Sequence, residues 1–245
     1  GHTACILSLA WSPDGRHLAS GCTAGIIHVW EVFSGKIVAS YRGHKRFVRG
    51  LAWSPDGQRI VSGGDYGDSS VQIWDVWSAR PLHILSEPYR VFAVGWRPDG
   101  SSVAAASFDG AVRIWDAEAG TLLYSYRQHA EPVYALSWSP DGTVLASAGQ
   151  GASVHLWSEV NGERLREYRG HRRAIKTLSW SPVAAVIASG DDDAVVRAWS
   201  ASTGEDIASL ERQPAWIRSL AWSPDGRWLA VASDKSVALW SPGPG

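Results

Sequence analysis

The chain has 245 residues, and its 23 Lys and Arg nearly balance its 24 Asp and Glu, which gives a formal net charge of -1 at pH 7. This balance excludes the strong positive field by which a protein binds nucleic acid or an anionic membrane non-specifically. Hydrophobic residues make up 45% of the chain and charged residues 19%, so the composition favours a folded globular core over intrinsic disorder.

The same composition bears on where the protein works. No segment has the run of roughly 18 apolar residues that a membrane-spanning helix needs, and residues 1–20 lack the layout of a signal peptide. Cys5 and Cys22 are too few for a disulfide framework, and we expect two buried free thiols. We therefore expect a cytoplasmic protein. Methionine is absent, so we expect this sequence to be part of a longer chain that begins upstream and is attached to further domains.

A tryptophan motif recurs along the whole chain. Trp-Ser-Pro begins at Trp11, Trp53, Trp138, Trp180 and Trp222, with Trp-Arg-Pro at Trp96, so the successive intervals are 42, 43, 42, 42 and 42 residues. A second series follows the first by 18 to 21 residues, at Trp30, Trp74, Trp115, Trp157, Trp199 and Trp240. A constant period of this size is the signature of a repeat architecture.

Each unit predicts four short strands, called a to d here. In the first unit, apolar residues run into Trp11, and further extended segments cover residues 17–20, 26–30 and 36–41. Pro-Asp-Gly between strands a and b predicts a turn, because Pro fixes φ and Gly accepts the left-handed conformation. The fifth unit has Pro182, Val183 and Ala184 instead, so either a non-Gly residue takes the strained position or the turn type changes.

Strand a carries bulky residues and tryptophan on one face and small residues on the other, so each sheet can pack tightly on both sides. Radial blades need this property at every repeat, whereas a flat sandwich does not. We therefore predict an all-β fold, a β-propeller with six four-stranded antiparallel blades in a single domain over residues 1–245. The repeats are predicted at residues 1–42, 43–85, 86–127, 128–169, 170–211 and 212–245. The d strands are predicted near residues 36–42, 80–85, 121–127, 164–169 and 206–211, and the last blade lacks its outer strand d.

These residues resemble the WD-repeat (β-transducin type) family of β-propellers, and the resemblance covers essentially the whole chain. Gly-His pairs at Gly1, Gly43 and Gly170 and Trp-Asp pairs at Trp74 and Trp115 match the family's motifs. Seven blades are frequent in the family, so a parent ring of six or of seven blades stays open. The uniform units and the excess of Arg over Lys also resemble repeat domains attached to bacterial signalling ATPases and kinases.

The resemblance implies a hydrogen-bonded set of His, Ser, Asp and Trp inside a blade. By offset, two units supply all four residues, namely His44, Ser62, Asp68 and Trp74, and His171, Ser189, Asp193 and Trp199. Other units depart from the pattern, with Ala24 and Gly151 at the Asp position and Glu87 and Gln213 at the His position. A Ser, His and Asp set could also serve a hydrolase. Its recurrence beside an indole donor favours a structural network instead.

No other pattern predicts chemistry. The remaining histidines show no ligand spacing, and no glycine-rich phosphate loop follows a strand and opens a helix. We therefore expect a protein that is not an enzyme, with no catalytic residue, no metal and no cofactor. An enzyme sited in a propeller channel stays as a disfavoured alternative, because it would need acids, histidines or metal ligands that converge at the axis.

The resemblance also implies that the loops before strand a and between strands b and c open onto one face that binds protein partners. The residues predicted there are Phe47, Arg49, Arg90, Phe92, Phe108, Tyr134, Lys176, Trp216 and Arg218. Aromatic and Arg side chains dominate the energetics of interfaces. We predict a basic face that captures an acidic or aromatic-bearing peptide segment of a protein partner. Two alternatives stay open: solvated loop charges without a role, and a propeller that binds RNA or phosphoinositides, which the overall charge disfavours.

Overall fold

The computed structural model describes residues 1–210, 213 and 215–242. These residues form an all-β structure of the propeller type, with 23 strands in six antiparallel sheets. None of the described residues forms a helix, so none of them belongs to a helix that could cross a membrane. The chain divides into two compact units, Gly1–Arg127 and Gln128–Gly245. The division falls between the third and fourth predicted repeats.

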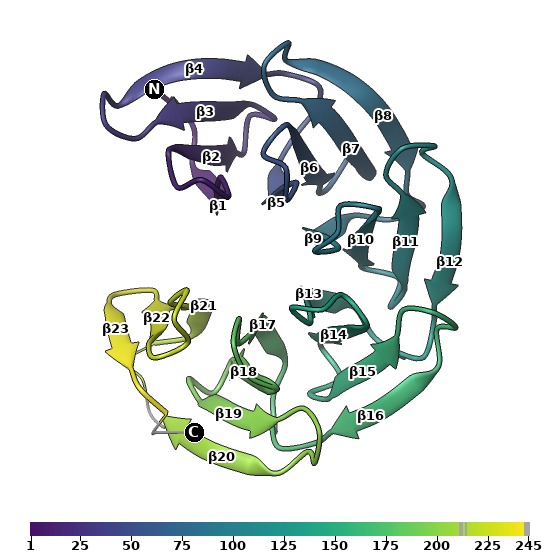
Figure 1. Cartoon of the computed structure of the whole chain (residues 1–245), viewed down its shortest axis with the longest axis vertical. Coiled ribbons are helices and arrows are strands. Elements are labelled where there is room, and N and C mark those ends of the chain that lie inside the picture. Colours follow the sequence, from purple (N-terminus) through teal and green to yellow (C-terminus); the bar gives the residue numbers. More distant parts are fainter. Residues whose placement is uncertain (211–212, 214, 243–245) are drawn as a thin grey trace. The chain divides into compact units, whose positions relative to one another are not determined.

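The first unit contains three four-stranded blades (Figure 1). Their strands are β1 (Ile6–Trp11), β2 (His17–Cys22), β3 (Ile27–Glu31) and β4 (Lys36–Tyr41), then β5 (Val48–Trp53), β6 (Arg59–Gly64), β7 (Ser70–Asp75) and β8 (Arg80–Ser86), then β9 (Val91–Trp96), β10 (Ser102–Ser107), β11 (Val112–Asp116) and β12 (Leu122–Tyr126). Within each blade the strands pair in chain order. The strands a to d predicted from the repeat are therefore the strands of one sheet.

The second unit contains two four-stranded blades and one blade with three strands among its described residues. Their strands are β13 (Val133–Trp138), β14 (Val144–Gly149), β15 (Val154–Ser158) and β16 (Arg164–Tyr168), then β17 (Ile175–Trp180), β18 (Val186–Asp191), β19 (Val196–Ser200) and β20 (Asp206–Leu210), then β21 (Ile217–Trp222), β22 (Leu229–Ser233) and β23 (Val237–Trp240). The three-stranded sheet agrees with a last blade that lacks strand d. Residue 211, predicted in the fourth strand of the fifth unit, lies outside the described residues.

The Pro-Asp-Gly turns show why the first two strands of a blade form a hairpin. In the fourth blade, Gly142 takes a φ of 70°, and the Asp141 carboxylate accepts hydrogen bonds from the Ser139 hydroxyl at 2.6 Å and the Thr143 amide at 3.1 Å. In the fifth blade, Ala184 does not take a positive φ. The turn type therefore changes there, and no strained non-Gly residue is needed.

Three pairs of adjacent blades are joined by a hydrogen bond from the tryptophan that ends strand a, whereas the fourth and fifth blades are joined by the Trp180 amide, which donates to the Ser137 hydroxyl at 3.0 Å. The Trp53 indole donates to the Ala10 carbonyl at 3.0 Å, and the Trp96 indole donates to the Ala52 carbonyl at 3.1 Å. In the second unit, the Trp222 indole donates to the Ser179 carbonyl at 3.0 Å. Each bond joins the first strand of one blade to the first strand of the blade before it, so the repeated tryptophan sets the spacing between blades.

Small residues allow the blades to approach closely. A Cβ atom added at Gly63 would lie 2.7 Å from Val91 Cγ1 and 3.0 Å from Val94 Cγ1, both in the next blade. At Gly151, by contrast, an added Cβ would meet no atom within 4 Å. One of the two thiols differs from the expectation, since Cys22 is buried but Cys5 is exposed, and both are free.

We expect Gly63→Ala to lower the free energy of unfolding by about 1–3 kcal/mol, because the new methyl group overpacks the contact with β9. Gly151→Ala is the matched control, and its effect should stay within about 0.5 kcal/mol. Urea denaturation of both variants measures the difference. Equal stability of the two variants would show that the blades do not pack through Gly63.

Candidate functional site

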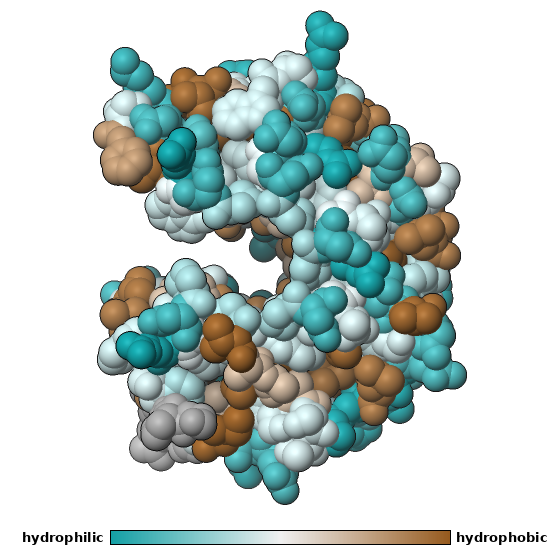
Figure 2. Space-filling view, viewed as in Figure 1, coloured by the Kyte–Doolittle hydropathy of each residue, from teal (hydrophilic) through white to brown (hydrophobic). Residues whose placement is uncertain are grey.

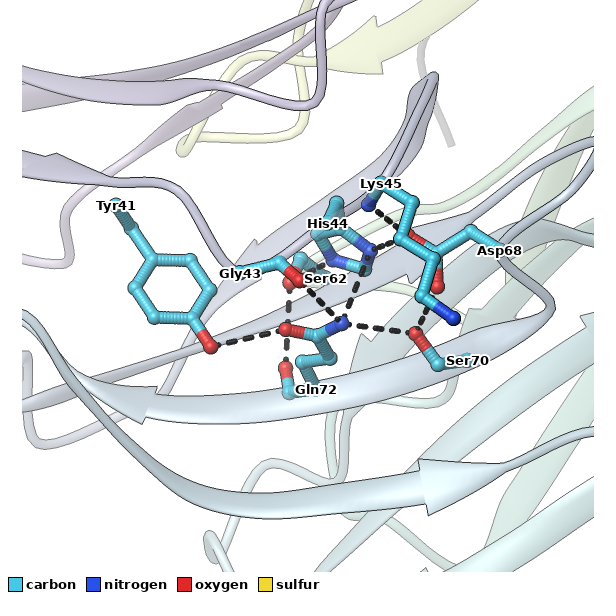
Figure 3. A network of polar contacts seen from close by, with 8 residues as sticks. All are labelled: Tyr41, Gly43, His44, Lys45, Ser62, Asp68, Ser70 and Gln72. Atoms are coloured by element: carbon cyan, nitrogen blue, oxygen red, sulfur yellow. Dashed lines mark hydrogen bonds and ion pairs between the residues drawn. The ribbon is translucent and has the colours of Figure 1, made fainter.

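The second blade contains a buried polar network (Figure 3). His44 Nε2 lies 2.7 Å from the Ser62 hydroxyl, and His44 Nδ1 lies 2.8 Å from Asp68 Oδ2. The side chains of His44 and Asp68 are almost completely buried, and Ser62 is fully buried. Burial raises the pKa of the Asp68 carboxyl. Hydrogen bonds from His44, Ser70 and the Lys45 amide together outweigh this effect, so the pKa lies below its ordinary value. A serine enclosed in this way cannot meet a substrate, which favours the structural interpretation of the set.

The fourth predicted member of this network, Trp74, contributes packing instead of a hydrogen bond. Its indole nitrogen is buried and has no hydrogen-bond partner. The Tyr41 ring, from the last strand of the preceding blade, stacks on the Trp74 ring with centroids 4.7 Å apart. The Tyr41 hydroxyl donates to Gln72 Oε1 at 2.9 Å, and the Gln72 amide donates to the Gly43 carbonyl at 3.3 Å. Tyr41 and Gln72 thus link two blades, and sequence analysis missed both.

The fifth blade differs from the prediction in its acidic member. His171 Nε2 lies 2.7 Å from the Ser189 hydroxyl, which also accepts a hydrogen bond from the Trp199 indole at 3.2 Å. His171 Nδ1 lies 2.7 Å from Asp191 Oδ2. The prediction of Asp193 at this place is wrong.

Loop length explains this correction. Trp199 follows Ser189 by ten positions, whereas Trp74 follows Ser62 by twelve. In the shorter loop, Asp191 ends β18, and its Oδ1 accepts the amides of Asp193 and Val195, each at 3.0 Å. This turn holds the Asp191 carboxylate at His171. The Asp193 carboxylate is directed away from the network, and lies 3.5 Å from the Arg173 guanidinium.

The blades without the acidic member keep part of the set. His2 Nε2 lies 2.7 Å from the Ser20 hydroxyl, which accepts the Trp30 indole at 2.7 Å. In the fourth blade, His129 Nε2 lies 2.8 Å from the Ser147 hydroxyl. Ser147 also accepts the Trp157 indole at 3.2 Å. Ser, His and Trp therefore meet in both of these blades.

The third blade replaces the histidine by a buried ion pair. Glu87 accepts a hydrogen bond from the Arg113 guanidinium at 2.7 Å and from the Trp115 indole at 3.3 Å. A second carboxylate, that of Asp109, also pairs with Arg113. Burial raises the pKa of Glu87 to about 7, and the Arg113 charge opposes that rise. The cluster satisfies its buried charges internally, as a structural element must.

A stacked histidine pair lies at the equivalent place in the fourth blade. The rings of His129 and His155 are 3.9 Å apart and nearly parallel. Burial, with a smaller effect of His155, lowers the pKa of His129 to about 3. The pair lines a cavity of about 450 Å³ together with Gly151 and Glu167. Within the described part of the chain, no three His, Cys, Asp or Glu residues are placed to hold a metal ion.

The predicted partner residues of the first unit gather at the strand ends of two blades. The Arg90 guanidinium lies 4.2 Å from the centroid of the Phe108 ring and 5.7 Å from that of Phe92. The Tyr66 ring, in the longer loop between β6 and β7, lies 5.8 Å from the same guanidinium. We call these four residues the Arg90 cluster. Tyr66 was not predicted from the sequence, because no fixed repeat position predicts an aromatic residue in an inserted loop.

Two further predicted residues lie near this cluster. Arg49, in β5, has its guanidinium 5.9 Å from the Phe92 ring centroid. Phe47, just before β5, is partly buried, and its carbonyl accepts the Asp65 amide at 2.9 Å. Phe47 thus contributes mainly to the hairpin between β5 and β6.

In the second unit, cations and rings also meet at the strand ends. The Lys176 ammonium lies 4.1 Å from the centroid of the Tyr134 ring, which belongs to the preceding blade. The Arg218 guanidinium lies 5.3 Å from the centroid of the Trp216 ring, and Trp216 is 55% exposed. In the second unit the structure therefore brings the predicted residues together in two pairs, Lys176 with Tyr134 and Arg218 with Trp216.

A regular pairing reduces the positive charge of this face. The second residue of strand a contacts the residue sixteen positions later, after strand b, in five blades. The pairs are Arg49 with Asp65, Phe92 with Phe108, Tyr134 with Gln150, Lys176 with Asp192, and Arg218 with Asp234. Three of the four predicted cations thus have a carboxylate of their own, so the face is less basic than the sequence predicts. The register of the hairpin, which sequence analysis did not use, explains the pairing.

On the face that Figure 2 draws, residues of high hydropathy are scattered among hydrophilic ones in each unit. The candidate site is therefore defined by the contacts between rings and cations.

We expect Asp191→Asn to lower the free energy of unfolding by about 1–3 kcal/mol, because the substitution removes a charged acceptor from a buried histidine. Asp193→Asn, two residues later and half exposed, should change it by less than about 0.5 kcal/mol. Chemical denaturation of the two variants tests the correction directly. A larger loss in Asp193→Asn than in Asp191→Asn would restore the original prediction.

The stacked histidines predict a loss of stability in acid. The unfolded chain binds a proton at His129 near the ordinary pKa of 6.5, whereas the folded chain binds it only near pH 3. The contribution of neutral His129 to the free energy of unfolding is therefore complete above pH 6.5. It decreases as the pH falls, and is smaller by about 2 kcal/mol at pH 5. Urea unfolding at pH 7.5 and pH 5 should show a larger loss in the wild type than in His129→Gln. The same loss in both proteins would contradict the prediction.

Two protein-family models match the chain. The model described as WD domain, G-beta repeat matches residues 1–31 and 35–75, and the model described as IFT122 first beta-propeller matches residues 90–244. The second match covers more than half of the chain.

The chain is also similar to curated proteins of several eukaryotes. It is 34% identical over 147 residues to the WD repeat-containing protein VIP3 of Arabidopsis thaliana, a match over 54% of this chain and 46% of that protein. It is 26% identical over 116 residues to the U5 small nuclear ribonucleoprotein 40 kDa protein of Dictyostelium discoideum, over 47% of this chain and 32% of that protein. It is 26% identical over 123 residues to the small ribosomal subunit protein RACK1y of Oryza sativa subsp. japonica, a match over 47% of this chain and 35% of that protein. The chain thus spans less than half the length of these relatives.

Proposed function

The chain belongs to the WD-repeat family of β-propellers, and from this premise we propose that it is a non-enzymatic scaffold that binds protein partners at the strand ends of its blades. The observation that carries the proposal is the gathering of exposed rings and cations there, in the Arg90 cluster and beside Lys176 and Arg218. The names of two relatives, a small nuclear ribonucleoprotein and a small ribosomal subunit protein, support a role in assemblies.

The proposed binding face consists of the residues predicted from the sequence together with Tyr66. In the first unit its members are Phe47, Arg49, Tyr66, Arg90, Phe92 and Phe108, and in the second unit they are Tyr134, Lys176, Trp216 and Arg218. Rings on strand ends are rigid anchors, because ordering them on binding costs little conformational entropy. The face fits an acidic or aromatic-bearing peptide segment of another protein. A cytoplasmic location is part of the same proposal.

Truncation of the exposed rings tests the proposal. We expect the triple variant Tyr66→Ala, Phe108→Ala and Trp216→Ala to lose at least about tenfold of the captured partner proteins in affinity purification, because exposed aromatic anchors dominate binding. The control is a triple variant of exposed rings outside the face, Phe33→Ala, Trp77→Ala and Trp228→Ala. Equal capture by the two variants, with both folded by circular dichroism, would refute the proposed face.

A further inference from the structure

Arg90 differs from the other cations of the proposed face in what surrounds it. Arg49, Lys176 and Arg218 each pair with a carboxylate of this chain. Arg90 instead lies among the rings of Phe108, Phe92 and Tyr66. Across residues 1–210, 213 and 215–242, no carboxylate forms an ion pair with Arg90. Its positive charge is therefore not neutralised within the described structure.

The neighbouring carboxylates are already engaged. Asp65 pairs with Arg49, and Glu87 and Asp109 pair with Arg113. Each of these contacts uses a carboxylate close in sequence to the Arg90 cluster. These three carboxylates are therefore engaged with other cations, and Arg90 is available to a carboxylate of another molecule.

The rings prepare Arg90 for such a contact. A guanidinium that packs on aromatic rings through its flat faces keeps its N–H groups at its edge, where they match the two oxygens of a carboxylate. The rings also limit the motion of the side chain, so less conformational entropy is lost when the contact forms. Tyr66 is 65% exposed and Phe108 is 38% exposed, which leaves ring surface beside Arg90 for a neighbouring apolar residue.

We propose that Arg90 binds the carboxylate of an Asp or Glu side chain in a peptide segment of the partner, while an adjacent apolar residue of that segment packs on Tyr66 and Phe108. This inference rests on the proposed function, and it assigns the chemistry of one contact within the face. The second unit offers a contrast, because Lys176 and Arg218 lie against rings but already have Asp192 and Asp234.

Charge complementarity favours a carboxylate over a phosphate. One carboxylate neutralises the single positive charge of Arg90. A phosphoserine brings a charge of about -1.5 to -2 at pH 7, which exceeds the single positive charge of Arg90. The segment is therefore expected to be acidic without phosphorylation.

The test uses a random peptide library displayed on phage and panned against the whole chain. We expect the enriched peptides to carry Asp or Glu beside an aromatic or aliphatic residue. Synthetic copies are then measured by fluorescence polarisation against the wild type, Arg90→Gln and Arg90→Lys. The dissociation constant should rise at least about tenfold in Arg90→Gln, since a charge-assisted bidentate contact is lost. It should also rise in Arg90→Lys, which keeps the charge but not the fork of donors.

Three controls make the result specific. Arg172→Gln removes an exposed cation of the second unit and should change the dissociation constant less than about twofold. Peptides with Asn or Gln in place of Asp or Glu should bind as weakly to the wild type as the acidic peptides bind to Arg90→Gln. Circular dichroism and the unfolding midpoint establish whether each variant is folded. If Arg90→Gln does not fold, Arg90→Lys alone tests the contact.

Several outcomes would overturn the inference: a library without binders, enriched peptides without acidic residues, an unchanged affinity in both Arg90 variants, or tighter binding of phosphoserine peptides than of acidic ones. The last outcome would assign the contact to phosphopeptides. If substitution of Arg90 leaves the affinity unchanged but the triple ring variant no longer binds, the inference fails and the proposed function stands. Partner capture that survives the triple ring variant would remove the proposed function as well.

Discussion

The hydrogen bond from the tryptophan that ends strand a to a carbonyl of the preceding blade organises the rest of the structure. It is formed by Trp53, Trp96 and Trp222 at nearly constant length. The bond requires the first strands of adjacent blades to lie close together, which Gly50 in β5 permits, because an added Cβ there would lie 3.0 Å from the Val94 amide nitrogen in β9. Blades held at this spacing bring their strand ends into contact, so side chains from different blades can meet there.

Two kinds of polar residue result from this arrangement. Those inside a blade, such as His44 with Asp68 and His171 with Asp191, satisfy one another away from water. Buried polar groups that are fully paired make a blade rigid, and a rigid blade is a suitable support for binding residues. Those at the strand ends remain accessible. The chemistry available to a partner therefore lies at the strand ends, whereas the Ser and His residues that resemble a catalytic set are enclosed in the blades.

The pairing of residues sixteen positions apart determines how much charge the strand ends present. Lys176 and Arg218 are basic in the sequence, but Asp192 and Asp234 neutralise them in the folded chain. Arg90 lies just before β9, outside the paired position, and the pair in its own blade is Phe92 with Phe108. The same hairpin register therefore neutralises some cations and surrounds another with rings. In the proposed function, recognition depends on one guanidinium and its aromatic neighbours more than on a broad positive field.

The sequence by itself determined the number of blades, their strands and the repeated tryptophans, because side-chain alternation and turn chemistry are local properties with a constant period. It also identified the Ser and His contacts, which occur at a fixed offset in every blade that has them. The acidic member was not determined in the same way: Asp191 takes the place predicted for Asp193, since two fewer loop residues change which carboxylate reaches the histidine. The neutralised cations and the Arg90 cluster were decided only by the tertiary structure. These contacts depend on hairpin register and on the approach of adjacent blades, which bring together residues that no short sequence pattern connects.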